Sequence, residues 1–293
     1  MDEPDLLVER FDEHRARLRS MAYRMLGSVS EAEDAVQETW LRFSVAETGR
    51  VENLGGWLTT VMARVCLNVL RARRQRGEEP LQVHVPDPII SREDEGHPEH
   101  EAVLADSVGL ALMVVLDTLS PAERLAFVLH DMFAVPFEEI APMIERSPAA
   151  ARQLASRARR RVRGQAPPPD SDPARQRDAV NAFFAAARDG DFEALVAVLD
   201  PEVVLRSDGG LARPRQNVVL TGARTVAGQA VTFGRLSPFA RPVLVNGAAG
   251  VVVANNGRLV SVMAFTVTGG KIVAIDVLSD PERLHRLDVP ALG

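Results

Sequence analysis

The chain has 293 residues, enough for two or three domains, and its hydrophobic fraction of 46% and charged fraction of 25% are those of a folded globular protein, which excludes wholesale disorder and collagen-like folds. The single cysteine, Cys66, cannot form an intramolecular disulfide, and the acidic start MDEPDLLVERFDEH has no apolar run of the signal-peptide kind, so we expect a cytoplasmic protein. The longest apolar run, Leu110–Leu116, is too short to cross a bilayer, so no membrane association is expected.

The net charge of −6 argues against nucleic-acid binding only if the charges are evenly spread, and they are not. Residues 77–106 hold nine acids and one arginine, and they carry prolines, so they form an acidic linker. Residues 71–76 hold four arginines, and residues 146–163 hold seven arginines and no acid. The proline-rich stretch GQAPPPDSDP separates a last, nearly neutral part that lacks the charge expected for phosphate binding.

The part before the acidic linker has the periodicity of helices. Apolar residues recur at three- and four-residue steps from Leu6 to Arg42, with Gly27 and Ser30 separating two helices. Ser30 and Glu33 have the spacing of a capping box, which would start the second helix. A third helix is predicted from about Leu54 to Arg74.

The part after the acidic linker predicts a helix-turn-helix. Ser120-Pro121 with Glu123 and Ser147-Pro148 each mark a helix start, and the last helix is arginine-rich. Such a helix can read base edges and phosphates in the major groove, although an arginine-rich helix can also be a merely solvated surface. Its candidate DNA-binding residues are Arg152, Gln153, Ser156, Arg157, Arg159 and Arg160.

These two parts resemble a known family. AYRMLGSVSEAEDAVQETWLRF and LGGWLTTVMARVCLNVLRARRQR resemble region two of extracytoplasmic-function RNA polymerase sigma factors, and LSPAERLAFVLHDMFAVPFEEIAPMIERSPAAARQLASRARRRVR resembles their region four. The resemblance implies binding to core RNA polymerase, through the clamp helices of its largest subunit and the flap of the second subunit, and to the −10 and −35 promoter elements. Two departures are Pro142, which should distort the first helix of the helix-turn-helix without disturbing the second, and Glu145 in place of the usual turn glycine.

The resemblance also implies roles for individual residues. The positions that match the polymerase-binding helix are Asp34, Gln37, Glu38, Trp40 and Leu41. Trp40 could equally be a core aromatic. The residues that would bind an unstacked base of the −10 element, or nearby phosphates, are Asn53, Arg64, Asn68, Arg71, Arg73 and Arg74. Asn68 stands where many relatives have aspartate.

The last part predicts an α+β fold. Two helices break at Asp189-Gly190, a short strand follows at Val203–Arg206, and the dipeptides Asn256-Gly257 and Gly269-Gly270 join apolar, β-branched runs as hairpins do. The order resembles the SnoaL-like, nuclear-transport-factor-2-like cone, an α+β barrel with a pocket. Asp208 and Asp276 could serve as acids there, but an aspartate beside glycines is more often a turn former, and the only histidine, His285, follows the last strand. We expect a regulatory domain with no catalytic residue, metal or cofactor.

A sigma factor with this appendage resembles the class numbered forty-one, the SigJ-like class, in which the fused domain replaces a separate anti-sigma partner. The supporting motifs are VPDP in the linker, which lacks the usual tryptophan, DGG, and DPERL near the C-terminus. The regulatory residues implied are Val85, Pro86, Asp87, Pro88, Asp208, Gly209, Gly210, Asp280, Pro281, Glu282 and Leu284. The appended domain would then pack on the linker and on regions two and four, and fix the separation of those regions.

The expected organisation is multidomain, with two all-α domains followed by the α+β domain. The predicted segments are region two at 5–76, the acidic linker at 77–106, region four at 107–165, the proline-rich linker at 166–173 and the SnoaL-like domain at 174–293. Two alternatives stay open: a SnoaL-like pocket that binds or turns over a small molecule, and a helix-turn-helix repressor that never binds polymerase.

Overall fold

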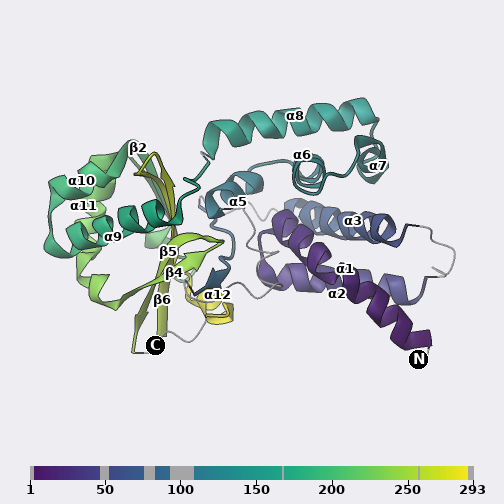
Figure 1. Cartoon of the computed structure of the whole chain (residues 1–293), viewed down its shortest axis with the longest axis horizontal. Coiled ribbons are helices and arrows are strands. Elements are labelled where there is room, and N and C mark those ends of the chain that lie inside the picture. Colours follow the sequence, from purple (N-terminus) through teal and green to yellow (C-terminus); the bar gives the residue numbers. More distant parts are fainter. Residues whose placement is uncertain are drawn as a thin grey trace. The chain divides into compact units, whose positions relative to one another are not determined.

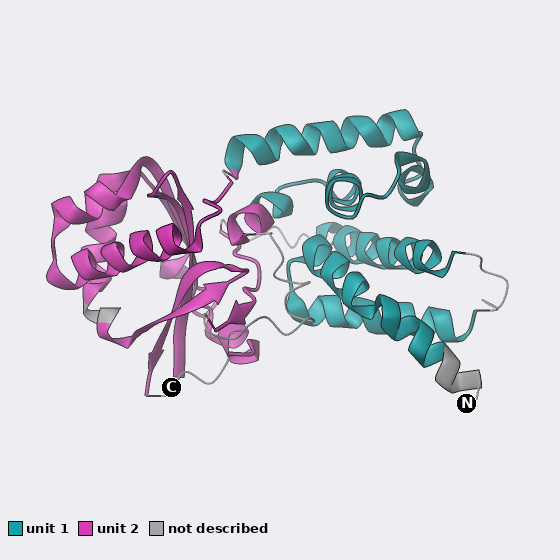
Figure 2. Cartoon of the chain, viewed as in Figure 1, with its two compact units in different colours: residues 1–79, 115–165 teal, residues 80–114, 166–293 magenta. Residues whose placement is uncertain are grey.

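The computed structural model describes residues 3–46, 53–75, 83–92, 109–166, 168–256 and 258–289. The chain divides into two compact units, shown in different colours in Figure 2: a helical unit of residues 1–79 and 115–165, and a C-terminal unit of residues 80–114 and 166–293. The described linker residues 83–92 therefore belong to the C-terminal unit, although in sequence they lie between two parts of the helical unit. None of the helices within the described ranges is long and apolar enough to span a membrane.

Three long helices open the helical unit (Figure 1): α1 (Glu3–Leu26), α2 (Val29–Ser44) and α3 (Leu54–Gln75), each in contact with the other two. Their apolar stripes form a core around the buried side chains of Phe11, Tyr23 and Phe43. The predicted cap at Ser30 is wrong. Gly27, with φ of 73°, ends α1, and the extended Ser28 already starts α2, so Ser30 lies inside its first turn.

The rest of the helical unit is formed by α5 (Leu110–Asp117), α6 (Pro121–Phe127), the short π-helix η2 (Val128–Met132), α7 (Phe137–Met143) and α8 (Pro148–Gln165). The boundary between the two units falls within α5. The predicted capping box of α6 is confirmed, since Ser120 Oγ accepts from Glu123 N (3.3 Å) and Ser120 N donates to Glu123 Oε2 (3.1 Å). Ser147 Oγ accepts from Ala150 N (3.2 Å) at the predicted start of α8.

Pro142 ends α7 early instead of bending it. The helix closes one residue later, at Met143, and Glu145 then takes the left-handed conformation (φ 56°) that a turn glycine would take. The 18-residue α8 is continuous, as expected. Its buried residues Ala151, Ala155 and Ala158 recur at helical spacing and form the side of α8 that packs on α6 and α7.

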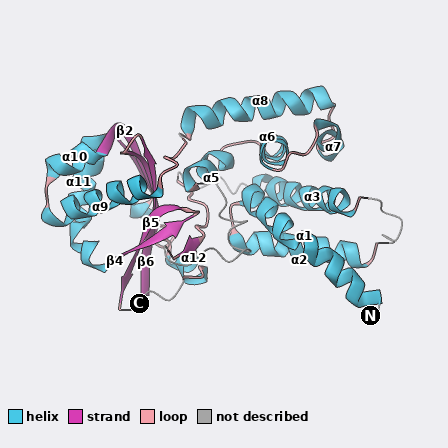
Figure 3. Cartoon of the chain, viewed as in Figure 1, coloured by secondary structure: helices cyan, strands magenta, loops and turns pink. Residues whose placement is uncertain are grey.

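The C-terminal unit is α+β, as predicted, and holds every strand of the described residues in one sheet (Figure 3). Its helices are α9 (Pro173–Asp189), α10 (Phe192–Val198), α11 (Ala223–Phe233) and α12 (Pro281–Arg286), with the 3-10 turns η3 (Pro214–Gln216) and η4 (Gly234–Phe239). Its strands are β1 (Ile90–Ser91), β2 (Leu199–Asp208), β3 (Val218–Thr221), β4 (Ala240–Val245), β5 (Ala248–Asn255), β6 (Arg258–Thr268) and β7 (Lys271–Leu278). One core joins α9, α10 and α11 to β2, β5, β6 and β7.

The strand order is β1-β4-β5-β6-β7-β2-β3. The predicted antiparallel hairpins β5–β6 and β6–β7 are confirmed, and Gly269 and Gly270 both have positive φ, as a two-residue hairpin turn requires. The strand predicted at Val203–Arg206 extends over Leu199–Asp208, because it pairs on both sides, antiparallel with β3 and parallel with β7. Strand β1, the linker segment that pairs with β4 at the edge of the sheet, was not predicted from the sequence.

Candidate functional site

The predicted polymerase-binding residues on α2 divide into an exposed group and a packed residue. Asp34, Gln37 and Leu41 are exposed, and Leu41 is 53% exposed, which is unusual for a leucine. Positions three and four residues apart share one side of a helix, so these side chains form a surface available to a partner. Trp40 is half-buried, and its ring packs edge-on against Phe11 at 5.1 Å between centroids. It therefore contributes to the core.

Glu38 completes the predicted set on α2. It forms an ion pair one turn away with Arg42, with 2.9 Å between Oε1 and Nη2, and both side chains are about half exposed. An exposed pair of this kind contributes little to stability, so Glu38 can exchange Arg42 for a basic group on a partner at low cost.

The predicted −10 residues on α3 are partly gathered on one face. Arg64, Asn68 and Arg71 are all exposed and follow the four- and three-residue steps of a single helix side. Arg74 is exposed one turn further on. The exposed guanidinium and amide groups give this face donors for phosphates and base edges.

Two other predicted −10 residues have structural contacts. Asn53 is the N-cap of α3, where its Oδ1 accepts from Gly56 N at 2.9 Å. Arg73 is half-buried: its Nη1 donates to the carbonyl of Leu26 at 3.0 Å, and its guanidinium forms an ion pair with Glu31. Arg73 thus ties α3 to the end of α1, which sequence reasoning did not predict.

The recognition-helix candidates on α8 are exposed, with one exception. The exposed members are Arg152, Gln153, Ser156, Arg157 and Arg160. Arg159 instead donates from Nε to Asp131 Oδ1 at 2.6 Å, which ties α8 to η2. Arg152 also lies over the ring of Phe137, 5.3 Å from its centroid. The buried alanine stripe of α8 thus leaves a strongly basic outer side.

The two halves of the helical unit contact each other through arginines. The buried Arg124 of α6 donates from Nε to the carbonyl of Arg24 in α1 at 3.0 Å and forms an ion pair with Asp117. Arg17 donates to the carbonyl of Phe133 at 3.2 Å, and both Arg17 and Arg24 lie over the Phe133 ring. The two halves of this unit are therefore packed as one body.

The three short motifs VPDP, DGG and DPERL meet in the C-terminal unit, around an arginine that sequence reasoning passed over. Arg283 Nε donates to Asp87 Oδ1 (2.9 Å), its Nη1 to Asp208 Oδ2 (2.9 Å) and its Nη2 to the carbonyl of Val85 (2.6 Å). The side chains are mostly buried, with 19% of Arg283, 15% of Asp87 and 3% of Asp208 exposed. We call Arg283, Asp87, Asp208 and the backbone of Val85 the Arg283 cluster.

The backbone around the Arg283 cluster explains the DGG and DPERL motifs. Asp208 Oδ2 accepts from Val85 N and its Oδ1 from Gly210 N, both at 3.0 Å. Gly210 has φ of 63°, and a Cβ there would lie 2.1 Å from Asp280 Oδ2, so any other residue would be strained and would have to displace the Asp280 carboxylate. Asp280 in turn caps α12 by accepting from Glu282 N at 3.0 Å. The predicted regulatory residues are thus brought together.

The linker also joins the sheet directly. Ile90 pairs with Val245 in the β1–β4 ladder, Asn246 N donates to the carbonyl of Ile89 at 2.8 Å, and Ile89 N donates to Asn246 Oδ1 at 3.0 Å. Val85 is fully buried. Residues 83–92 are therefore held at two places, the Arg283 cluster and the edge of β4.

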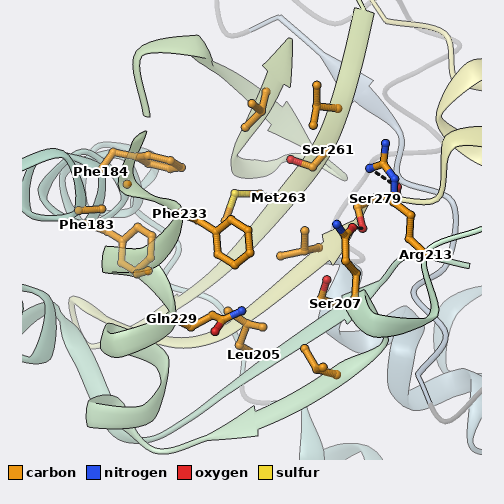
Figure 4. Close-up of a pocket in the computed structure, with 18 of the residues that line it drawn as sticks. Phe183, Phe184, Leu205, Ser207, Arg213, Gln229, Phe233, Ser261, Met263 and Ser279 are labelled. Carbon is orange, nitrogen blue, oxygen red and sulfur yellow. Dashed lines mark hydrogen bonds between the residues drawn. The ribbon is translucent and has the colours of Figure 1, made fainter. Parts of the chain in front are cut away.

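The C-terminal unit contains a cavity of about 200 Å³ between the sheet and helices α9 and α11 (Figure 4). Its apolar part includes Phe183, Phe184, Phe233, Leu205 and Met263. Its polar part is formed by Arg213, Arg215, Gln216, Gln229 and the serines 207, 261 and 279. No acidic residue or histidine is among the described residues that line it.

The two aspartates considered as acids lie outside this cavity. Asp208 belongs to the Arg283 cluster. Asp276 is fully buried, which raises the pKa of its carboxyl, and it accepts from Arg206 Nη1 at 3.0 Å. His285 is exposed on α12. None of the three is among the described residues that line the cavity.

A helix-turn-helix with a basic outer side, joined to a three-helix unit and to an α+β cone, defines a class of DNA-binding transcription proteins. The family models agree, since residues 10–76 match Sigma-70 region 2 and residues 109–162 match Sigma-70 region 4. The chain is 35% identical to the probable ECF RNA polymerase sigma factor SigI of Mycobacterium tuberculosis, over 98% of both chains. It is 36% identical to the ECF RNA polymerase sigma factor SigJ of the same organism, over 94% of this chain and 92% of that one.

The fold agrees as well. The crystal structure of the extracytoplasmic-function sigma factor SigJ of Mycobacterium tuberculosis matches with a TM-score of 0.76 at 31% identity, over 97% of this chain and all of that one. The chain therefore belongs to the extracytoplasmic-function RNA polymerase sigma factors, and its fused SnoaL-like domain is part of the match. It is an alternative sigma factor, a partner of core RNA polymerase and promoter DNA, and the relatives it matches are named as sigma factors rather than enzymes.

Proposed function

We propose that the C-terminal unit regulates promoter recognition by holding the linker between regions two and four. The surface of α2 around Asp34, Gln37 and Leu41 binds the clamp helices of core polymerase, and region four binds the flap. The exposed face of α3 reads the −10 element, and α8 reads the −35 element. We further propose that the protein acts in the cytoplasm and that the C-terminal cavity has no catalytic role.

The packing of the helical unit supports the proposal that its two halves must separate before the protein can bind both promoter elements. Helix α3 contacts α6 and α7, and both of these pack on α8. Packed helix axes lie about 8–10 Å apart, so α3 and α8 are separated by roughly 20 Å. The −10 and −35 elements are about 25 base pairs apart, or roughly 85 Å at 3.4 Å per base pair. The two helices cannot read both elements until the halves of the helical unit separate.

The linker sets how far they can separate. Residues 76–109 could span roughly 110–120 Å if fully extended, which is enough for the two promoter elements. While residues 83–92 stay paired with β4 and the Arg283 cluster, only residues 76–83 and 92–109 can extend, by roughly 25 Å and 60 Å, and each of these segments starts from the C-terminal unit. Tethering keeps the local concentration of these segments on the order of mM, so the held state persists without a separate anti-sigma protein. Core polymerase then competes with the held linker.

The observation that carries this proposal is the set of four hydrogen bonds between the linker and the Asp208–Arg283 pair: Val85 N to Asp208, Arg283 to the Val85 carbonyl, and both Nε and Nη2 of Arg283 to Asp87 Oδ1. Run-off transcription by the full-length chain with purified core polymerase tests it, with Asp87→Ala weakening the hold on the linker by removing the carboxylate that Arg283 binds. Asp288→Ala is the matched control, because Asp288 is an exposed acid of the same unit. We expect Asp87→Ala to raise initiation at low core concentration and to match wild type when core is saturating, and the control to behave as wild type.

Equal activity of Asp87→Ala and wild type at every core concentration would contradict the linker mechanism. Initiation that core polymerase alone supports equally well would contradict the sigma role itself. The proposed binding of α2 to core polymerase is tested separately with Leu41→Ala. Its affinity for core polymerase should fall, while its affinity for DNA should not change.

A further inference from the structure

The cavity of the C-terminal unit combines an apolar wall with an arginine for which the described part of the chain supplies no acidic partner. Phe183 and Phe184 of α9 and Phe233 of α11 face it from one side, and Arg213 lies at the other end with Ser279 (Figure 4). Arg213 Nη1 donates to the carbonyl of Ser279 at 3.1 Å. Among the described residues, no carboxylate forms an ion pair with Arg213 or with Arg215, which also lines the cavity.

We propose that this cavity is a binding site for a small aromatic carboxylate, with the carboxylate on Arg213 and the ring among the three phenylalanines. The planar guanidinium of an arginine matches a carboxylate in geometry and charge. Its hydrogen bonds to a carboxylate are stronger than its hydrogen bond to a neutral carbonyl such as that of Ser279. The phenylalanine rings and Met263 favour an aromatic body over a polar one. Because a cavity of 150 Å³ holds benzene, one of about 200 Å³ holds a ring with one small substituent.

The site is connected to the Arg283 cluster by hydrogen bonds. Ser279 N donates to the carbonyl of Asp208 at 2.7 Å, and Ser279 Oγ bonds Gln216 Oε1 at 2.8 Å, while the carboxylate of Asp208 holds Val85 and Arg283. A ligand carboxylate competes with the Ser279 carbonyl for Arg213. Ligand binding therefore changes the hydrogen bonding of Ser279. This residue precedes Asp280, the N-cap of the helix α12 that carries Arg283. This coupling rests on the proposed function of the linker, whereas the binding site does not.

Titration calorimetry on the full-length chain tests the site, with three probes of graded chemistry. Benzoate carries ring and charge, benzamide the ring alone, and acetate the charge alone. We expect benzoate to bind at least about tenfold more tightly than either of the others, since the charge-assisted hydrogen bond and the buried ring each contribute to its affinity and each of the other probes lacks one of them. Arg213→Gln should lose about tenfold in benzoate affinity, and Phe233→Ala, at a half-exposed ring, several-fold.

Arg224→Gln is the matched control, because Arg224 is exposed on α11, pairs with Glu193 and does not line the cavity. Equal binding of benzoate to Arg213→Gln and wild type, or equal binding of benzamide and benzoate to wild type, overturns the site. No binding of benzoate at millimolar concentration overturns it as well. Circular dichroism of Arg213→Gln and Phe233→Ala confirms that a loss is not a loss of fold.

Hydrogen exchange of residues 83–92 with and without benzoate tests the coupling. Changed protection in wild type, absent in Arg213→Gln, supports it. Binding that depends on Arg213 with unchanged linker protection keeps the site and overturns the coupling. Failure of the linker mechanism itself appears elsewhere, as unchanged transcription by Asp87→Ala.

Discussion

Arginine has opposite uses in α8 and in the Arg283 cluster. On α8 the side chains of Arg152, Arg157 and Arg160 are exposed and gathered in a run, so they offer charge to an outside partner. In the cluster a single arginine is mostly buried, and its donors are distributed over Asp87, Asp208 and the Val85 carbonyl. A run of like charges therefore indicates a binding surface. A lone arginine between buried acceptors indicates a structural contact that holds segments of the chain together.

Arg283→Ala should have the largest effect. It leaves the mostly buried carboxylates of Asp87 and Asp208 without their cation, and breaking such a pair costs about 3–5 kcal/mol. We expect faster hydrogen exchange in residues 83–92 and in β2, and a lower free energy of unfolding of the C-terminal unit. Arg286→Ala, at an exposed position on the same helix, is the control and should change neither quantity.

The loss should stay within the C-terminal unit, and the sequence provides the probes. Both tryptophans, Trp40 and Trp57, and the only cysteine belong to the helical unit. Burial raises the pKa of the Cys66 thiol to about 12, so it should resist alkylation while that unit is folded. Unchanged alkylation and tryptophan fluorescence in Arg283→Ala would locate the damage. A joint loss of both would contradict independent stability of the two units.

The second prediction concerns α8. Arg157→Ala should weaken DNA binding by about 1–3 kcal/mol and reduce the salt dependence by about one phosphate contact. Arg159→Ala should have a smaller effect, because Arg159 is held by Asp131 in the free protein. Fluorescence anisotropy of a labelled duplex at several salt concentrations measures both quantities. Equal losses in the two variants would mean that Arg159 leaves Asp131 on binding DNA.

The same contrast explains how much of the molecule the sequence could predict. Helical periodicity, two serine-proline helix starts and two hairpin dipeptides are local signals, and the elements they predicted are present. The two-residue strand at Ile90–Ser91 has no local signal, since it exists only because the edge of β4 is available to it. Periodicity is a local property, so it cannot predict that residues 90–91 pair with residues 244–245.

Site residues follow the same rule. The exposed arginines of α8 form a run that composition reveals, although composition cannot show that Arg159 is paired with Asp131. Arg283 stands within a motif that was noticed, yet nothing local distinguishes it from Arg286 three residues later. Only the folded positions of Asp87 and Asp208 do so. The available signal for Arg283 was that it is a basic residue inside a motif that also contains helix-capping and turn-forming residues.

The third prediction concerns the turn before α8. Glu145 adopts φ of 56°, a conformation that costs most residues about 1–2 kcal/mol and glycine almost nothing. After the extra backbone entropy of glycine, Glu145→Gly should stabilise the helical unit by roughly 0.5–1 kcal/mol. Arg146→Gly, at the next residue, has no positive φ to relieve and should destabilise. Urea unfolding followed by tryptophan fluorescence gives the sign of both changes, and the same sign in both would contradict the argument.

The smallest effect is expected at Asp170, a carboxylate held by backbone groups instead of an arginine. It accepts from Gly270 N and Gly269 N, both at 2.9 Å, and these bonds lower its pKa, with a further contribution from Arg175. A lowered pKa stabilises the fold above the unfolded value, near pH 4, and this stability is lost as the pH falls through the folded value.

Asp170→Asn tests this directly, because the amide no longer titrates. The difference in urea midpoint between wild type and variant should be constant from pH 7 to about 5 and should shrink as the pH falls below about 4. Other carboxylates titrate in the same range, but they do so in both proteins and cancel in the difference. A gap that stays constant down to pH 2 would show that the turn glycines do not favour the charged form of Asp170.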